Sequence, residues 1–182
     1  MTSAEVAAVL FETTGVQATQ EPARNRRLDN TDALCVLVPE RDGRATLRLV
    51  RERLPASWQA FLGRMYNDGE MGDDEQVEII VAPGHDRYDL IRWVGTHGPN
   101  YDLDTEGIVR AVEALHAKHP LDILHCESDQ VTVRFLNDPG DWRPLADYLS
   151  ELCPDLILQG FDDEGELAEF LAEEREVTLW WD

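Results

Sequence analysis

A chain of 182 residues suits one domain or two small ones, and it is long enough to bury roughly 70% of its extended surface without a disulfide or metal staple. Its formal net charge of −21 repels nucleic-acid phosphates and anionic membranes and attracts basic partners. No apolar run approaches the ~20 residues of a membrane span, and the first 15 residues lack the basic segment of a signal peptide. We therefore expect a cytoplasmic protein.

Local patterns predict helices and one strand before residue 67. Thr2 and Glu5 form a capping box that begins a helix, and Gly15 ends it. A polar loop follows at 17–32, and the apolar run 33–39 predicts a buried strand. Three further elements are expected after it: a turn at Asp42-Gly43, a helix at 45–54, and a second helix from Pro55 that carries Trp58, Phe61, Leu62 and Met65.

The remaining patterns alternate between strands and helices. A polar loop at 67–75 separates them from the preceding elements. The expected strands are 76–82, 88–94, 121–126, 130–136 and 177–182, and the five-residue gap between the first two permits a hairpin. The expected helices begin near 105, near 141, and after a cap at Asp162 or Asp163.

This order of elements predicts an α+β fold with a mostly antiparallel sheet and helices packed on one face. From residue 88 onward it is similar to a split β-α-β layer with an additional helix. We expect one compact domain over 1–182, with an N-terminal α/β segment at 1–75 and a C-terminal core at 76–182.

The segment GTHGPNYDLDTEG, residues 95–107, carries acidic side chains in a calcium-loop pattern at Asp102, Asp104 and Glu106. A calcium loop lies between two helices, and the helix before this segment is missing from the pattern. Glu113, the twelfth position, would lie about 13 Å along the following helix from Asp104. The segment therefore indicates a helix start with Asp104 as its N-cap.

The loop Gly95–Asn100 is the best candidate for a small-ligand site, because its polar side chains precede a helix N-terminus that can receive an anion. The ligand-binding candidates are Thr96, His97, Asn100, Tyr101 and Gln159. The alternative is structural: Thr96 and Asn100 satisfy backbone groups, and Tyr101 packs.

The histidine and cysteine positions give little support to a metal site or a redox site. His116 and His119 fall at a helix C-terminus, and the adjacent His125 and Cys126 should face opposite sides of a strand. We therefore expect no metal and no cofactor. The three cysteines form no Cys-x-x-Cys pair and are expected to be buried thiols: Cys35, Cys126 and Cys153.

Three blocks of the C-terminal part are similar to those of a bacterial family, domain of unknown function 4253. They are YDLIRWVGTHGPNYDLDTEGIV, CPDLILQG and the terminal LWWD. The resemblance covers about residues 76–182 and fades toward a variable N-terminal segment. The family often carries an acid where this chain has Leu158, and it implies no particular activity, cofactor or ligand.

The negative charge is concentrated in the C-terminal part. Residues 85–182 hold 23 acidic and 7 basic side chains, against 14 and 9 in residues 1–84. Nucleotide-binding, zinc-protease and serine-hydrolase motifs are missing from the sequence. The leading hypothesis is therefore a non-enzymatic acidic protein-binding module, of the kind that an immunity or antitoxin-like inhibitor of a basic partner would be.

The partner-binding candidates are Asp162, Asp163, Glu166, Glu169 and Glu173. Two alternatives stay open: a charge that serves solubility alone, and an enzyme or small-ligand-binding protein that uses the Gly95–Asp104 loop.

Overall fold

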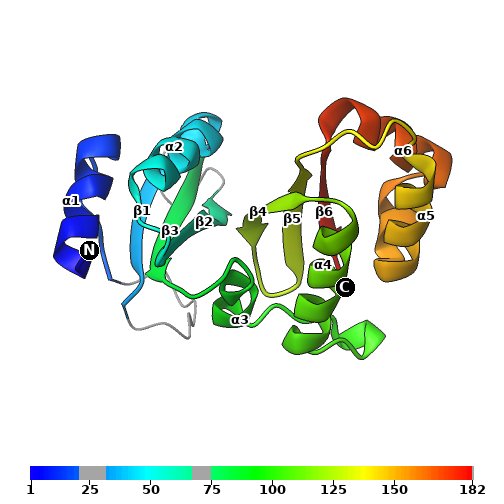
Figure 1. Ribbon diagram of the computed structural model, residues 1–182, viewed down its shortest axis with the longest axis horizontal. Coiled ribbons are helices and arrows are strands. Elements are labelled where there is room, and N and C mark those ends of the chain that lie inside the picture. The colour runs from blue at the N-terminus through cyan, green and yellow to red at the C-terminus, as the bar shows by residue number, and fades with distance from the viewer. Residues whose placement is uncertain (21–31, 67–74, 182) are drawn as a thin grey trace. The chain divides into compact units, whose positions relative to one another are not determined.

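The computed structural model describes residues 1–20, 32–66 and 75–181, and the chain folds as two compact units, Met1–Val94 and Gly95–Asp182 (Figure 1). Helices and strands are both present, and the strand pairs inside each unit are antiparallel, so the α+β class is confirmed. The two units meet between residues 94 and 95, whereas the sequence analysis expected the N-terminal segment to end at residue 75. No helix in these ranges combines the length and the apolar character of a membrane span.

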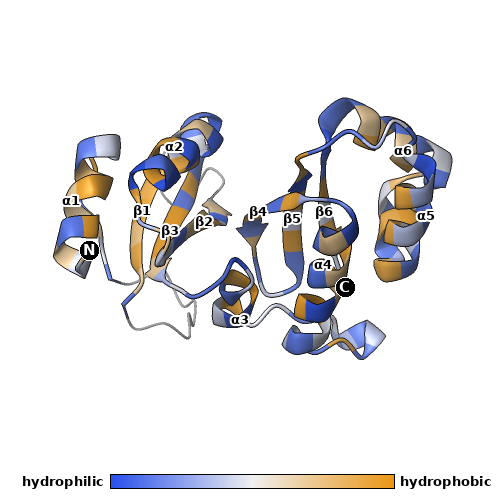
Figure 2. Ribbon diagram, in the orientation of Figure 1, coloured by the Kyte–Doolittle hydropathy of each residue, from blue (hydrophilic) through white to orange (hydrophobic). Residues whose placement is uncertain are grey.

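The described residues of the first unit form three strands with β3 in the centre. Its elements are α1 Ser3–Thr14, β1 Leu34–Pro39, α2 Glu40–Arg53, β2 Trp58–Tyr66, β3 Gln76–Pro83 and α3 Asp89–Val94. β3 pairs with β1 on one side and with β2 on the other. Helix α2 packs against all three strands, and α1 packs against α2 and β1. In Figure 2 the strands β1 and β3 are mostly orange, consistent with their buried residues.

The ends of α1 form as the sequence predicts. The Thr2 side chain accepts a hydrogen bond from the Glu5 backbone, the Glu5 carboxylate accepts one from the Thr2 backbone, and Gly15 caps the helix in the left-handed conformation at φ 72°. Val6 and Leu10 are fully buried. Residues 21–31 of the expected 17–32 loop, and 67–74 of the expected 67–75 loop, lie outside the described residues.

The turn expected at Asp42-Gly43 is wrong, because both residues lie in the first turns of α2. A Cβ on Gly43 would lie 2.5 Å from the Cγ1 atom of Val77 in β3. Glycine is therefore present here because the helix approaches the sheet closely, and not because the chain turns.

The second helix expected after Pro55 is also wrong, because this segment is the strand β2. Its neighbours on β3 include Ile80, opposite Phe61, and Ile79, opposite Leu62, and the register shifts between Leu62 and Met65. Apolar side chains on both faces of a strand, together with a bulge, produce spacings that imitate a helix. Backbone pairing with β3 decides the outcome.

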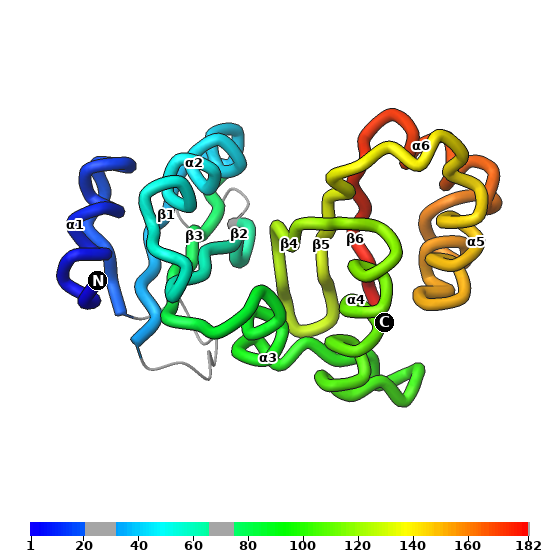
Figure 3. The backbone as a smooth tube through the Cα atoms, in the orientation of Figure 1, coloured from blue at the N-terminus to red at the C-terminus, as the bar shows by residue number. Residues whose placement is uncertain are grey.

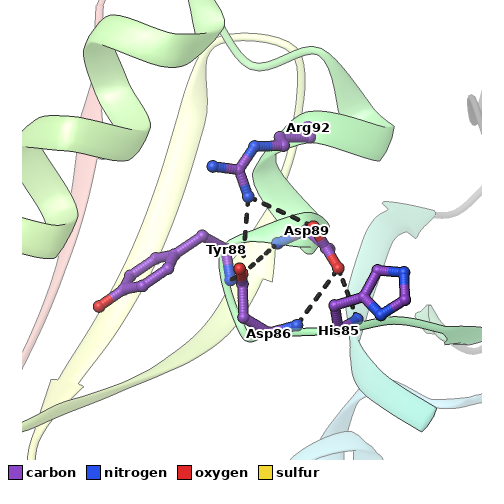
Figure 4. Close-up of polar contacts among 5 residues, drawn as sticks. All are labelled: His85, Asp86, Tyr88, Asp89 and Arg92. Atoms are coloured by element: carbon purple, nitrogen blue, oxygen red, sulfur yellow. Dashed lines mark hydrogen bonds and ion pairs between the residues drawn. The ribbon is translucent and has the colours of Figure 1, made fainter. Parts of the chain in front are cut away.

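The strand expected at 88–94 is instead the short helix α3. Figure 4 shows the reason in the turn before it. The Asp86 carboxylate accepts hydrogen bonds from the backbone N–H groups of Tyr88 (2.7 Å) and Asp89 (3.1 Å). Such a side-chain cap overrides the strand preference of a run rich in aromatic and branched residues. The first strand of the expected split β-α-β layer is therefore a helix.

Asp89 completes this turn from the other side. Its Oδ2 atom accepts from the backbone N–H groups of His85 (2.7 Å) and Asp86 (3.3 Å), and its Oδ1 atom lies 3.3 Å from Arg92. Burial by itself would raise the pKa of Asp89, but these backbone donors and the guanidinium hold the pKa below its ordinary value.

The second unit contains three strands with β5 in the centre. Its elements are the 3-10 turn η1 Pro99–Tyr101, α4 Thr105–Lys118, β4 Leu121–Cys126, β5 Gln130–Phe135, α5 Arg143–Leu152, the π-helix η2 Leu156–Gly160, α6 Glu164–Glu174 and β6 Glu176–Trp180. The chain leaves the sheet after β5, forms α5 and α6, and returns as β6 beside β5 (Figure 3). The predicted helices and strands after residue 104 are thus all present.

The helices of this unit present one apolar face each to its core. The buried positions recur at helical spacing: Ile108, Val112 and Leu115 in α4, Leu145 and Leu149 in α5, and Leu167 and Leu171 in α6. Phe170, which we expected to face inward with Leu167 and Leu171, is instead 39% exposed. Asp104 caps α4 by accepting a hydrogen bond from the Gly107 backbone at 2.6 Å. Residues 102–106 therefore begin a helix, as predicted.

Candidate functional sites

The loop at the start of the second unit is fastened to the turn between β4 and β5. The Thr96 hydroxyl donates to the backbone carbonyl of Glu127 at 2.6 Å, and Thr96 is fully buried. The backbone N–H of His97 donates to the carbonyl of Ser128 at 2.8 Å, while the His97 ring, which is exposed, lies 3.0 Å from the Gly95 carbonyl. Thr96 therefore satisfies a backbone group, as the structural alternative predicted.

Gly98 continues the loop by packing directly against Trp181. A Cβ on Gly98 would lie 2.7 Å from the Cβ of Trp181 and 2.9 Å from its Cγ. The Trp181 side chain is 1% exposed, and its indole N–H donates to the carbonyl of Leu152 at 3.1 Å. The close approach requires glycine at position 98, since any side chain would displace the tryptophan.

Two of the predicted ligand-binding residues converge on one buried carboxyl group. The Tyr101 hydroxyl donates to Oδ1 of Asp155 at 2.8 Å, and the Gln159 amide donates to the same oxygen at 3.0 Å. Asp155 is only 3% exposed. Asp155 comes directly before η2, so the contact joins the 95–104 loop to the π-helix. Asn100 is exposed and lies in η1 beside Tyr101.

Asp155 is the residue of this cluster that sequence reasoning missed. It stands inside the CPDLILQG block, but nothing in the local pattern predicts that a carboxyl group there is buried. A charged side chain is rarely buried without hydrogen-bonding partners, and here a phenol and an amide supply two. The arrangement holds Tyr101 and Gln159 in fixed orientations. A ligand-binding role for these residues stays a prediction.

Cys153 lies next to this cluster as a buried thiol. It is fully buried, and its Sγ atom lies 2.8 Å from the backbone carbonyl of Trp180. Burial raises the pKa of Cys153 to about 11. The thiol is therefore protonated at neutral pH and lacks the thiolate that nucleophilic catalysis or metal binding requires. Cys35 and Cys126 are buried thiols as well.

We call the five predicted partner-binding residues of the last helix the acidic stripe: Asp162, Asp163, Glu166, Glu169 and Glu173. All five are exposed. Steps of three and four residues place Glu166, Glu169 and Glu173 on one side of α6, away from the buried Leu167 and Leu171. The stripe is thus a continuous acidic face on a helix that packs against α5 and β6.

Two residues of the acidic stripe also stabilise the N-terminus of α6. Asp163 is the N-cap and accepts from the backbone N–H groups of Gly165 (2.7 Å) and Glu166 (3.0 Å). The donor of Glu166 first, and then that of Gly165, lowers the pKa of Asp163. The Glu166 carboxylate accepts from the Asp162 backbone at 2.7 Å. Asp163 and Glu166 therefore have a structural role in capping α6.

The charge around the acidic stripe is largely uncompensated. Residues 138–176 hold thirteen acidic and two basic side chains. Both basic side chains already have partners: Arg143 lies 2.9 Å from Asp147, and Arg175 lies 2.8 Å from Asp138. Little positive charge within this segment is left to neutralise the stripe.

The described residues contain no group of three or more His, Cys, Asp and Glu side chains placed to hold a metal ion. His116 has a structural contact instead, since its Nδ1 atom accepts from the Leu121 backbone at 3.1 Å. His125 is buried, with its Nε2 atom 3.3 Å from Glu127.

The second unit is thus an antiparallel α+β fold in which a Gly-Thr loop, a Cys-Pro-Asp block and the terminal tryptophan close on one another. The model of the family described as Domain of unknown function (DUF4253) matches residues 78–182, and the chain belongs to this family. No curated protein and no solved structure matches the chain. The three blocks that carried the resemblance meet in this unit: Tyr101 comes from the first, Asp155 and Gln159 from the second, and Trp181 from the third.

Proposed function

We propose that this protein is a non-enzymatic binding module whose acidic stripe docks a basic segment of a protein partner. One observation carries the proposal: residues 138–176 hold thirteen acidic side chains against two arginines, and these arginines already form ion pairs with Asp147 and Asp138. A single-sign field of this kind steers a basic partner toward the surface and repels phosphates and anionic lipids.

The position of the acidic stripe supports a docking role. Leu167 and Leu171 anchor α6 from the inside, so the carboxylates on its outer side stand on a fixed helix. Asp163 and Glu166 serve the helix cap, whereas Glu169 and Glu173 have no hydrogen bond or ion pair with any described residue. Glu169 and Glu173 are therefore the carboxylates most available to a partner.

The partner would be a basic protein in the cytoplasm, where three buried thiols remain reduced. A net charge of −21 fits an immunity or antitoxin-like inhibitor that covers a basic surface of its target. Such an inhibitor needs no reactive group of its own, which agrees with a Cys153 thiol whose pKa of about 11 leaves it protonated.

Affinity capture tests this proposal. The purified chain, immobilised, is exposed to a lysate of its source at low salt and then washed at high salt. We expect a basic protein that is retained at low salt and released at high salt, because salt screens exposed charge pairs. The Glu169→Gln/Glu173→Gln variant should retain less of it. The matched control is Glu52→Gln/Glu113→Gln, which removes the same charge from α2 and α4. Equal retention by all three proteins, or no salt-released partner, would reject the proposal.

A second candidate function is a small-ligand-binding protein or an enzyme that uses the Gly95–Asp104 loop. The observation that favours it is the buried Asp155, which fixes Tyr101 and Gln159, with the exposed Asn100 next to Tyr101 in η1. A thermal-shift screen with small anions tests it. A ligand that raises the melting temperature of the wild type, and does so much less for Asn100→Ala, would support this function. No stabilising ligand, or equal stabilisation of both proteins, would exclude it.

A further inference from the structure

We propose that the acidic stripe selects arginine side chains of its partner, through an exposed pair of phenylalanine rings that lies among the carboxylates. This inference rests on the proposed function and names the chemistry that the partner must present.

The aromatic pair consists of Phe161, directly before the cap of α6, and Phe170 within the helix. The ring centroids lie 5.2 Å apart with the planes tilted by 53°. Phe170 is 39% exposed, and Phe161 is partly exposed. The two rings therefore form a small, partly exposed apolar surface and are not part of the core that Leu167 and Leu171 occupy.

Carboxylates surround this surface. Glu166, Glu173 and Glu174 stand at positions −4, +3 and +4 relative to Phe170, which are its nearest neighbours on the surface of a helix at about 5–6 Å between Cβ atoms. Asp162 follows Phe161 directly in the chain. Glu173 and Glu174 form no ion pair with any described residue, so their charge faces solvent beside the rings.

Arginine is the side chain that fits both features together. Its guanidinium is planar, stacks on aromatic faces, and offers a fork of N–H donors that matches a carboxylate. It is also less strongly hydrated than the ammonium group of lysine, so it loses less on contact with an apolar ring.

Other occupants fit this surface less well. An uncharged apolar side chain would contact the rings but would desolvate the surrounding carboxylates without pairing them. A second copy of this chain also has a net charge of −21, so it would be repelled from this surface. Charge complementarity therefore points to an arginine-bearing segment of a different protein.

The test compares two peptides of equal charge, nona-arginine and nona-lysine, by isothermal titration calorimetry with the full chain at one low salt concentration. We expect tighter binding of nona-arginine by the wild type. In Phe170→Leu, which keeps an apolar side chain on the helix, we expect the arginine-to-lysine affinity ratio to fall by about two- to fivefold, the loss of one exposed cation–π contact. The affinity for nona-lysine should stay unchanged.

The matched control is Phe11→Leu in α1. Phe11 is 50% exposed, but its helical neighbours Ala7, Ala8 and Thr14 carry no charge, so its loss should leave the ratio at the wild-type value. An unchanged ratio in Phe170→Leu overturns the arginine inference while leaving the proposed function intact. A wild type that binds neither peptide overturns both. Circular dichroism confirms that Phe170→Leu keeps its helix content.

Discussion

Substitution of Tyr101 by phenylalanine tests the buried cluster around Asp155. The change removes one hydroxyl and leaves the ring in place. The lost hydrogen bond is 2.8 Å long and ends on a carboxyl oxygen of a side chain that is 3% exposed. Hydrogen bonds to charged groups contribute about 1.5–3 kcal/mol to stability. Because Gln159 still donates to the same oxygen, we expect the free energy of unfolding to fall by about 1–2 kcal/mol.

Urea unfolding followed by tryptophan fluorescence measures this loss, and an unchanged slope with denaturant shows that only the stability has changed. Gln159→Met is the comparison variant. Gln159 is exposed, so water replaces part of its contact, and we expect a loss of only about 0.5 kcal/mol. A Tyr101→Phe variant as stable as the wild type, or a larger loss in Gln159→Met than in Tyr101→Phe, would refute the assignment of Asp155 as the buried anchor.

Three further predictions concern backbone packing and titration. Gly98→Ala should lower the free energy of unfolding by about 1–3 kcal/mol in a urea titration, because its Cβ would meet Trp181 at 2.7 Å. Cys153 should resist a thiol reagent at pH 8 until the chain unfolds. Its pKa is raised from 9.0 to about 11 in the folded protein, so between these pH values the thiol loses its proton only in the unfolded state, and the free energy of unfolding should fall as pH rises through this range. Asp89→Asn should lower the free energy of unfolding by about 1–2 kcal/mol at pH 7.

Each of the three has a result that contradicts it. Gly140→Ala is the control for Gly98→Ala. A Cβ at position 140 meets nothing within 4 Å, so the alanine is disfavoured there only by the φ of +79°. An equal loss of unfolding free energy in both variants would show that the contact with Trp181 is not the cause. Rapid labelling of native Cys153 would contradict its burial. The pKa of Asp89 is lowered from 3.8, so its contribution is present above that pH and is lost as pH falls through the lower value. The free energies of unfolding of the wild type and of Asp89→Asn should therefore converge at acid pH. A difference between them that stays constant with pH would contradict the ion-pair assignment.

The elements that sequence reasoning predicted correctly are those that local chemistry determines. The capping box at Thr2 and the aspartate caps at 104 and 163 need only a few neighbouring residues, and each begins a helix at the expected place. The strand β3 and the helix α4 also lie at the expected places. β3 is a short apolar run that is buried on both faces, and the buried residues of α4 recur at helical spacing.

The elements that it missed depend on contacts distant in the sequence or on competing local bonds. β2 has apolar residues on both faces and a bulge, so its spacing imitates a helix until β3 pairs with it. α3 forms from a strand-like sequence because the carboxylates of Asp86 and Asp89 cap its first turn. Asp155 escaped notice because its burial arises only when the loop around Tyr101 folds over it.

The salt dependence of partner binding tests the central claim most directly. The protein captured by the wild type is titrated with the wild type and with Glu169→Gln/Glu173→Gln at increasing salt. We predict that the variant binds about three- to tenfold more weakly at low salt, as expected for two exposed charge pairs, and that the two affinities converge as salt rises. Equal affinities at low salt, with the same salt dependence, would contradict a docking role for the acidic stripe.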